Sequence, residues 1–205
     1  PWERLQYLRG PENAYADLAW GGAQVRRLIE MIHDYYLRHV EHILRTDVDA
    51  LNMMDDWGSQ HRLLIAPQMW VEYFYPLYRD YVSLAHAAGK SVLMHSDGYI
   101  MDIYPHLIEM GVDVLQALQF SAEGMDPREL KRRTGDRLCY EGGVSVQTTL
   151  PFGTVEDVVQ EVKDRIRVLA KDGGYILGPS HAIQAGTPPE NIVALFDAAS
   201  SYYPH

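Results

Sequence analysis

Two histidines and one aspartate are the residues whose types and spacing are most suited to metal binding. His95 and Asp97 are two positions apart at the end of the apolar run 91–95, and alternation along a strand points such residues to one face. His181 follows a similar run, 175–178. Two imidazoles and one carboxylate would leave positions on a divalent metal open for water or substrate. The structural alternative is that Asp97 caps the next helix and His95 forms a hydrogen bond.

Three further carboxylates follow apolar runs and are candidates for catalysis. Asp55 and Asp56 end the run 48–54, and because neighbouring side chains of a strand point to opposite faces, we expect only one of them at the site. That one could act as a general base, while the other would stabilise the following loop. Glu141 is a comparable candidate with the same structural alternative.

The rest of the chain alternates between patterns typical of strands and of helices. Helical segments repeat apolar residues at steps of three and four, and short apolar runs ending in polar residues separate them. We predict strands over 48–54, 91–95, 112–118, 137–143 and 175–178. We predict helices over 21–45, 69–88, 100–110, 127–134, 155–170 and 188–199.

Strands that alternate with helices predict an α/β fold with a parallel sheet, because each connection must cross over. The regular spacing favours a (β/α)8 TIM barrel over a doubly wound sheet. In such a barrel the chemistry lies at the carboxyl ends of the strands, where all the candidates above occur. Five strands are too few to close the barrel, so we expect residues 1–205 to form a single domain that holds part of it.

Composition narrows the classes of partner. The chain has 18 Lys and Arg against 28 Asp and Glu, a net charge of −10, which argues against nucleic acid because affinity for phosphates needs clustered cations. We see neither an apolar run of the roughly 20 residues that a membrane helix needs nor a signal peptide. A single cysteine, Cys139, forms no internal disulfide, which is typical of a cytoplasmic protein.

Four motifs resemble the uroporphyrinogen decarboxylase superfamily over about 47–199. They are DDWGSQ at 55–60, MHSDG at 94–98, GGVSVQ at 142–147 with LPFGT at 150–154, and GPSHAI at 178–183 with TPPEN at 187–191. The resemblance implies a (β/α)8 barrel whose fourth to eighth strands are the five predicted here. It also leads us to expect that Gln60, Gln147 and His181 bind substrate.

The two branches of this superfamily imply different chemistry. In the methyltransferases that serve corrinoid proteins and coenzyme M, a His-x-Cys pair and a later Cys bind zinc, and the corresponding residues here are His95, Asp97 and His181. Since this set contains no thiolate, it would suit zinc, iron or manganese equally. The leading expectation is a metal-dependent methyltransferase, with zinc as the first choice of metal, a small-molecule substrate and a corrinoid protein as partner.

Two alternatives remain open at this point. One is decarboxylation of the acetate groups of a tetrapyrrole, as in uroporphyrinogen decarboxylase, which needs no cofactor. The other is a fragment or scaffold that keeps the fold without the activity. In every case a partial barrel leaves its first and last strands unpaired, so we expect a homo-oligomer.

Overall fold

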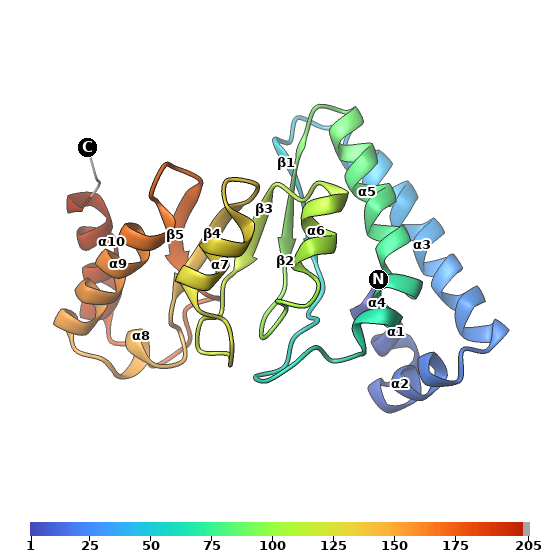
Figure 1. The fold of residues 1–205 in the computed structure, drawn as a ribbon, viewed down its shortest axis with the longest axis horizontal. Coiled ribbons are helices and arrows are strands. Elements are labelled where there is room, and N and C mark those ends of the chain that lie inside the picture. The colour runs from blue at the N-terminus through green and yellow to red at the C-terminus, as the bar shows by residue number, and fades with distance from the viewer. Residues whose placement is uncertain (203–205) are drawn as a thin grey trace.

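The computed structural model describes residues 1–202 and contains one five-stranded parallel sheet in the order β1-β2-β3-β4-β5 (Figure 1). Each strand pairs with the next one along the chain, which leaves β1 and β5 at the edges of the sheet, and every pair is parallel. The strands are β1 (Ala50–Met54), β2 (Ser91–His95), β3 (Val114–Ala117), β4 (Cys139–Val144) and β5 (Tyr175–Pro179). The predicted parallel sheet is confirmed, and its sequential order is that of part of a TIM barrel.

Helices connect the strands and also form an N-terminal group before β1 (Figure 1). The N-terminal group comprises α1 (Trp2–Arg9), α2 (Pro11–Trp20) and α3 (Ala23–Ile43). The others are α4 (Pro67–Tyr73), α5 (Tyr75–Ala87), α6 (Tyr104–Met110), α7 (Pro127–Thr134), α8 (Thr149–Phe152), α9 (Val155–Leu169) and α10 (Pro189–Ser201). None of the helices in residues 1–202 has both the length and the apolar character needed to cross a membrane.

Two proline residues explain where the predicted helices were too long. The single helix expected over 69–88 is two helices, because the φ of Phe74, −118°, departs from the ordinary helical value and Pro76 then falls in the first turn of α5. A proline is tolerated there, since the first N–H groups of a helix have no partner inside it. Pro105 has the same position in α6, which begins at Tyr104 instead of residue 100.

The sheet is buried on one face more than on the other. In β1 and β2 the alternate side chains Leu51, Met53, Val92 and Met94 lie in the core. The residues between them are less buried, and Met54 is 61% exposed. The strand predicted to be buried over 48–54 is therefore buried on one face only, because alternate side chains of a strand point to opposite faces.

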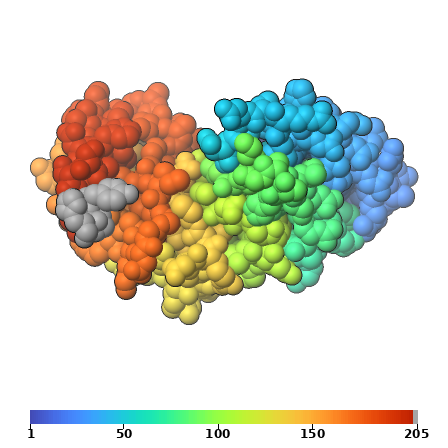
Figure 2. Space-filling model, turned by 90° about the horizontal axis from the view of Figure 1, so that it is seen from above, coloured from blue at the N-terminus to red at the C-terminus, as the bar shows by residue number. Residues whose placement is uncertain are grey.

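The apolar core divides into two clusters along the chain. The larger one gathers side chains from α1 through β4, including Trp2, Trp57 and Trp70, together with Leu169 at the end of α9. The smaller one lies among β4, α9 and α10 and contains Val144, Val162 and Leu195. The molecule is accordingly elongated, with the N-terminal helices at one end and the C-terminal helix at the other (Figure 2).

Candidate functional site

His95, Asp97 and His181 meet at the carboxyl end of the sheet. One nitrogen from each imidazole and one carboxylate oxygen lie within 4.8 Å of one another. The Nε2 atom of His95 is 4.0 Å from Oδ1 of Asp97, and Nε2 of His181 is 3.7 Å from Oδ2 of Asp97. The carboxylate thus stands between the two rings, with each of its oxygens facing a different imidazole.

The Asp97 carboxylate is held in an unfavourable environment. Its Oδ1 atom is buried and has no hydrogen-bond partner among the described residues. Burial, followed by the negative charge of Asp56, raises the pKa of Asp97 above its ordinary value, although His95 and His181 oppose that shift. A buried acceptor without a partner is costly for the fold, so this oxygen is a position where a bound cation would be stabilised.

Two glycines allow the loop that carries Asp97 to reach its position. Gly58, after β1, and Gly98, after β2, lie with their backbones in contact. A Cβ atom at Gly58 would be 2.5 Å from the carbonyl oxygen of Asp97, and one at Gly98 would be 2.5 Å from the carbonyl carbon of Gly58. Gly98 also has a φ of 76°, which favours glycine. Gly58 of the DDWGSQ motif and Gly98 of the MHSDG motif are therefore needed for this close contact between the two loops.

Asp55 and Asp56 point to different surroundings, as strand alternation predicts. Asp55 is 2% exposed and accepts hydrogen bonds from the backbone N–H groups of Trp2 and Glu3 and from the hydroxyl of Tyr78. It therefore anchors the start of α1, and its contacts are structural. Asp56 faces the site: its Oδ1 accepts the backbone N–H of Asp97 at 2.9 Å and lies 3.8 Å from Nε2 of His95.

Two other candidates lie apart from the three metal-binding candidates. Glu141 is in β4 and accepts a hydrogen bond from the Gln116 amide at 2.9 Å. In the strand register Gln116 pairs with His95 on one side and with Glu141 on the other. The Cα atoms of His95 and Glu141 are therefore two strand spacings apart, about 10 Å. Gln60 has an exposed side chain, and its backbone carbonyl accepts the N–H of Glu123.

A cavity of about 280 Å³ opens beside the three metal-binding candidates. Its polar lining includes Gln147, which sequence analysis selected, together with Gln119 and Gln184, which it did not. Gln119 follows β3 just as the other candidates follow their strands, and this signal could have identified it. Asp97 and His181 line the same cavity, so it communicates directly with the candidate metal ligands.

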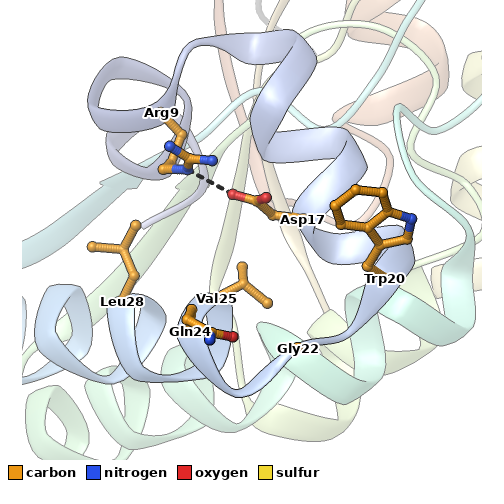
Figure 3. Close-up of a pocket in the computed structure, with 7 residues that line it drawn as sticks. All are labelled: Arg9, Asp17, Trp20, Gly22, Gln24, Val25 and Leu28. Atoms are coloured by element: carbon orange, nitrogen blue, oxygen red, sulfur yellow. Dashed lines mark hydrogen bonds and ion pairs between the residues drawn. The ribbon is translucent and has the colours of Figure 1, made fainter.

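A second hollow, among the N-terminal helices, offers no comparable chemistry (Figure 3). It is lined by Val25 and Leu28 of α3, by the exposed Trp20, and by an Arg9–Asp17 ion pair whose atoms are 2.6 Å apart. Because the two charged groups of this lining neutralise each other, we assign the chemistry to the carboxyl end of the sheet.

Comparison with known proteins connects this fold and site to a family. The family model described as Uroporphyrinogen decarboxylase (URO-D) matches residues 1–202. The chloroplastic uroporphyrinogen decarboxylase of Nicotiana tabacum is 26% identical over 166 residues, which are 79% of this chain and 39% of that protein. The uroporphyrinogen decarboxylase of Synechococcus sp. (strain CC9605) is 26% identical over 189 residues, which are 87% and 50% of the two chains.

A solved structure supports the fold. A methyltransferase from Methanosarcina mazei superposes with a TM-score of 0.73 at 18% identity, covering 95% of this chain and 54% of that one. The chain thus spans about half the length, or less, of these relatives. The family match covers nearly all of the chain, including the 46 residues before the segment where the motifs lie. We conclude that the protein belongs to the uroporphyrinogen decarboxylase family.

Proposed function

We propose that this chain carries the site of a divalent-metal-dependent enzyme of the uroporphyrinogen decarboxylase superfamily, with methyl transfer as its reaction. The observation that carries the proposal is the buried Oδ1 atom of Asp97, which has no hydrogen-bond partner in residues 1–202 and faces an imidazole nitrogen. An acceptor of this kind costs free energy unless a donor or a cation satisfies it. A divalent cation shared with His95 and His181 would satisfy it.

The donor set fits such a metal. Two imidazoles and one carboxylate suit zinc, iron or manganese, and three protein ligands leave room for a substrate atom. A divalent cation bound there would act as a Lewis acid toward a heteroatom of the methyl donor or acceptor. A small methylated compound or a corrinoid protein would be the other participant in the reaction.

Neighbouring residues would hold these ligands in place. The Asp56 carboxylate accepts the Asp97 backbone N–H at 2.9 Å, and the Gln119 amide oxygen accepts the next N–H, that of Gly98, at 2.9 Å. Hydrogen bonds therefore hold the backbone on both sides of the Asp97 Cα atom. Such outer contacts orient a metal ligand and commonly change metal affinity by about 10- to 100-fold when removed.

Decarboxylation is the second candidate, and the names of the curated relatives favour it. In the uroporphyrinogen decarboxylase branch that reaction needs no metal. Metal content therefore distinguishes the two candidates before any substrate is known.

The experiment measures the metal bound per chain and the thermal midpoint of unfolding, using protein purified without chelators or nickel resin. The parent is compared with Asp97→Asn, His95→Ala and His181→Ala, and with His42→Ala, which removes an exposed histidine of α3 as a control. We expect metal in the parent and the control, and little in the other three, with similar midpoints for all metal-free forms. Equal metal in all five proteins, or metal in none of them, would refute the proposal and favour decarboxylation.

A further inference from the structure

The backbone dictates which way two amide groups of the cavity are turned. The N–H of Gly98 can only donate, so it must meet the oxygen of the Gln119 amide, at 2.9 Å. The Gln119 nitrogen is thereby directed to the oxygen of Gln147, at 3.1 Å, and the Ser121 hydroxyl donates to the same oxygen. The Gln147 nitrogen is left turned away from these partners.

The outcome is one amide donor and one amide acceptor that belong to exposed side chains and have no protein partner within residues 1–202. Within residues 1–202 the Gln147 amide nitrogen donates no hydrogen bond. In Gln184 the acceptor is the group without a partner. Its nitrogen donates to the carbonyl oxygen of Ala182 at 2.7 Å, which fixes the amide because a carbonyl can only accept. Within residues 1–202 the Gln184 oxygen therefore accepts no hydrogen bond. Both side chains line the cavity of about 280 Å³.

The charge of the cavity narrows the chemistry of its ligand. None of its seven lining residues, all within the described chain, is Lys or Arg, and Asp97 supplies a carboxylate. Arg165 lines a neighbouring hollow that shares Ser180 with this cavity. Its guanidinium is already bound to Glu161 at 2.7 Å and to the Gly143 carbonyl at 2.9 Å. In the metal-free protein a carboxylate ligand would therefore meet no free Lys or Arg side chain in this lining.

We propose that this cavity binds an uncharged group that both accepts and donates hydrogen bonds, namely a hydroxyl or primary carboxamide of the substrate. Such a group accepts from the Gln147 nitrogen and donates to the Gln184 oxygen. A carboxylate has no donor for Gln184, and an ammonium group has no acceptor for Gln147. This inference rests on the proposed function in one respect: the proposed function places the reacting end of the substrate at Asp97 and His181, which line the same cavity.

The test measures binding of two small probes of similar size by ligand-observed NMR titration: propionamide and propionate. Each is titrated into the metal-free and the zinc-supplemented protein. Gln147→Glu replaces the donor with an acceptor, and Gln184→Met removes the acceptor at similar length. Gln24→Glu is the matched control, because it makes the same charge change as Gln147→Glu at the N-terminal hollow.

In the metal-free proteins we expect the parent and the control to bind propionamide more tightly than propionate, and the two cavity variants to bind propionamide about tenfold more weakly, the effect of losing one hydrogen bond. Propionate binding to the metal-free parent as tightly as propionamide, or unchanged propionamide binding in both cavity variants, would overturn the proposal. Zinc content is measured separately. Protein that takes up no zinc but binds propionamide selectively would reject the proposed function alone, and protein that takes up zinc but lacks this selectivity in its metal-free form would reject this inference alone.

Discussion

Gly58→Ala is expected to weaken both the fold and the proposed metal site, because the structure has no room for a side chain at position 58. A Cβ atom there would lie 2.5 Å from the Asp97 carbonyl oxygen and 2.5 Å from the Tyr99 backbone nitrogen. Since ordinary non-bonded contacts of carbon are about 3.5 Å or longer, the two loops must separate by about 1 Å. All the obstructing atoms are backbone, so no side chain can rotate to relieve the contact.

This displacement sets the expected magnitudes. Overpacking of this kind commonly lowers the free energy of unfolding by about 1–3 kcal/mol. The same movement would carry Asp97 relative to His95 and His181, whereas metal–ligand distances tolerate changes of only about 0.2 Å. We therefore expect divalent-metal affinity to fall by about 10- to 100-fold, as for other changes that disturb the supports of a ligand.

Urea unfolding of the metal-free protein, followed by tryptophan fluorescence, measures the first effect, and competition with a chromophoric chelator measures the second. Gly178→Ala is the control, since its Cβ would lie 3.9 Å from the nearest atom, the Cα of Gly142. The reasoning fails if the two alanine variants have the same unfolding free energy and the same metal affinity. Reduced stability with unchanged affinity would refute only the link between the glycine contact and the ligand.

Three further predictions concern other parts of the chain. Asn191 is buried and donates to the carbonyls of Leu150 and Gly153 at 2.9 and 2.8 Å. Asn191→Asp offers these carbonyls no donor, so it should lower the urea-derived free energy of unfolding by about 2–4 kcal/mol. Asn13→Asp, at an exposed position, should change that free energy by less than about 1 kcal/mol, and equal effects of the two substitutions would contradict this account. Burial raises the pKa of the Cys139 thiol, so at pH 8 its alkylation by iodoacetamide should be slower than that of the urea-unfolded chain; an equal rate would refute it. The free edges of β1 and β5 should make the isolated chain associate, and a monodisperse monomer in light scattering at micromolar concentration would contradict that prediction.

Local patterns predicted much of the fold because the helices and strands depend on neighbouring residues. The five strands were located within a few residues, and alternation separated Asp55 from Asp56. Which of the two enters the site could not be predicted, since the partners of Asp55 are Trp2, Glu3 and Tyr78, which lie 23 to 53 positions away.

The position of Gln119 after a predicted strand could have identified it as a candidate, but its contact with Gly98 could not be predicted, for a different reason. The strand predicted over 112–118 ends at Ala117, where Ala117 and Leu118 adopt φ values of 88° and 52°. These left-handed conformations are uncommon for residues other than glycine, and periodicity gives no sign of them. The turn they make brings Gln119 to Gly98, 21 positions earlier. Contacts of this kind follow from tertiary structure, so the cavity could be described only after the fold.

The division of the apolar core into two clusters has a consequence for how the protein opens. Elements that share a cluster tend to unfold as one cooperative unit, and the smaller unit generally opens at lower free energy. Here the smaller cluster belongs to β4, α9 and α10, and β5 contributes Tyr175 and Leu177 to its margin. His181 follows β5, whereas His95 and Asp97 belong to segments of the larger cluster. Sub-global unfolding of the C-terminal unit would therefore remove one of the three proposed ligands, and amide exchange in α9 and α10 would report the same event that would limit how long a metal ion stays bound.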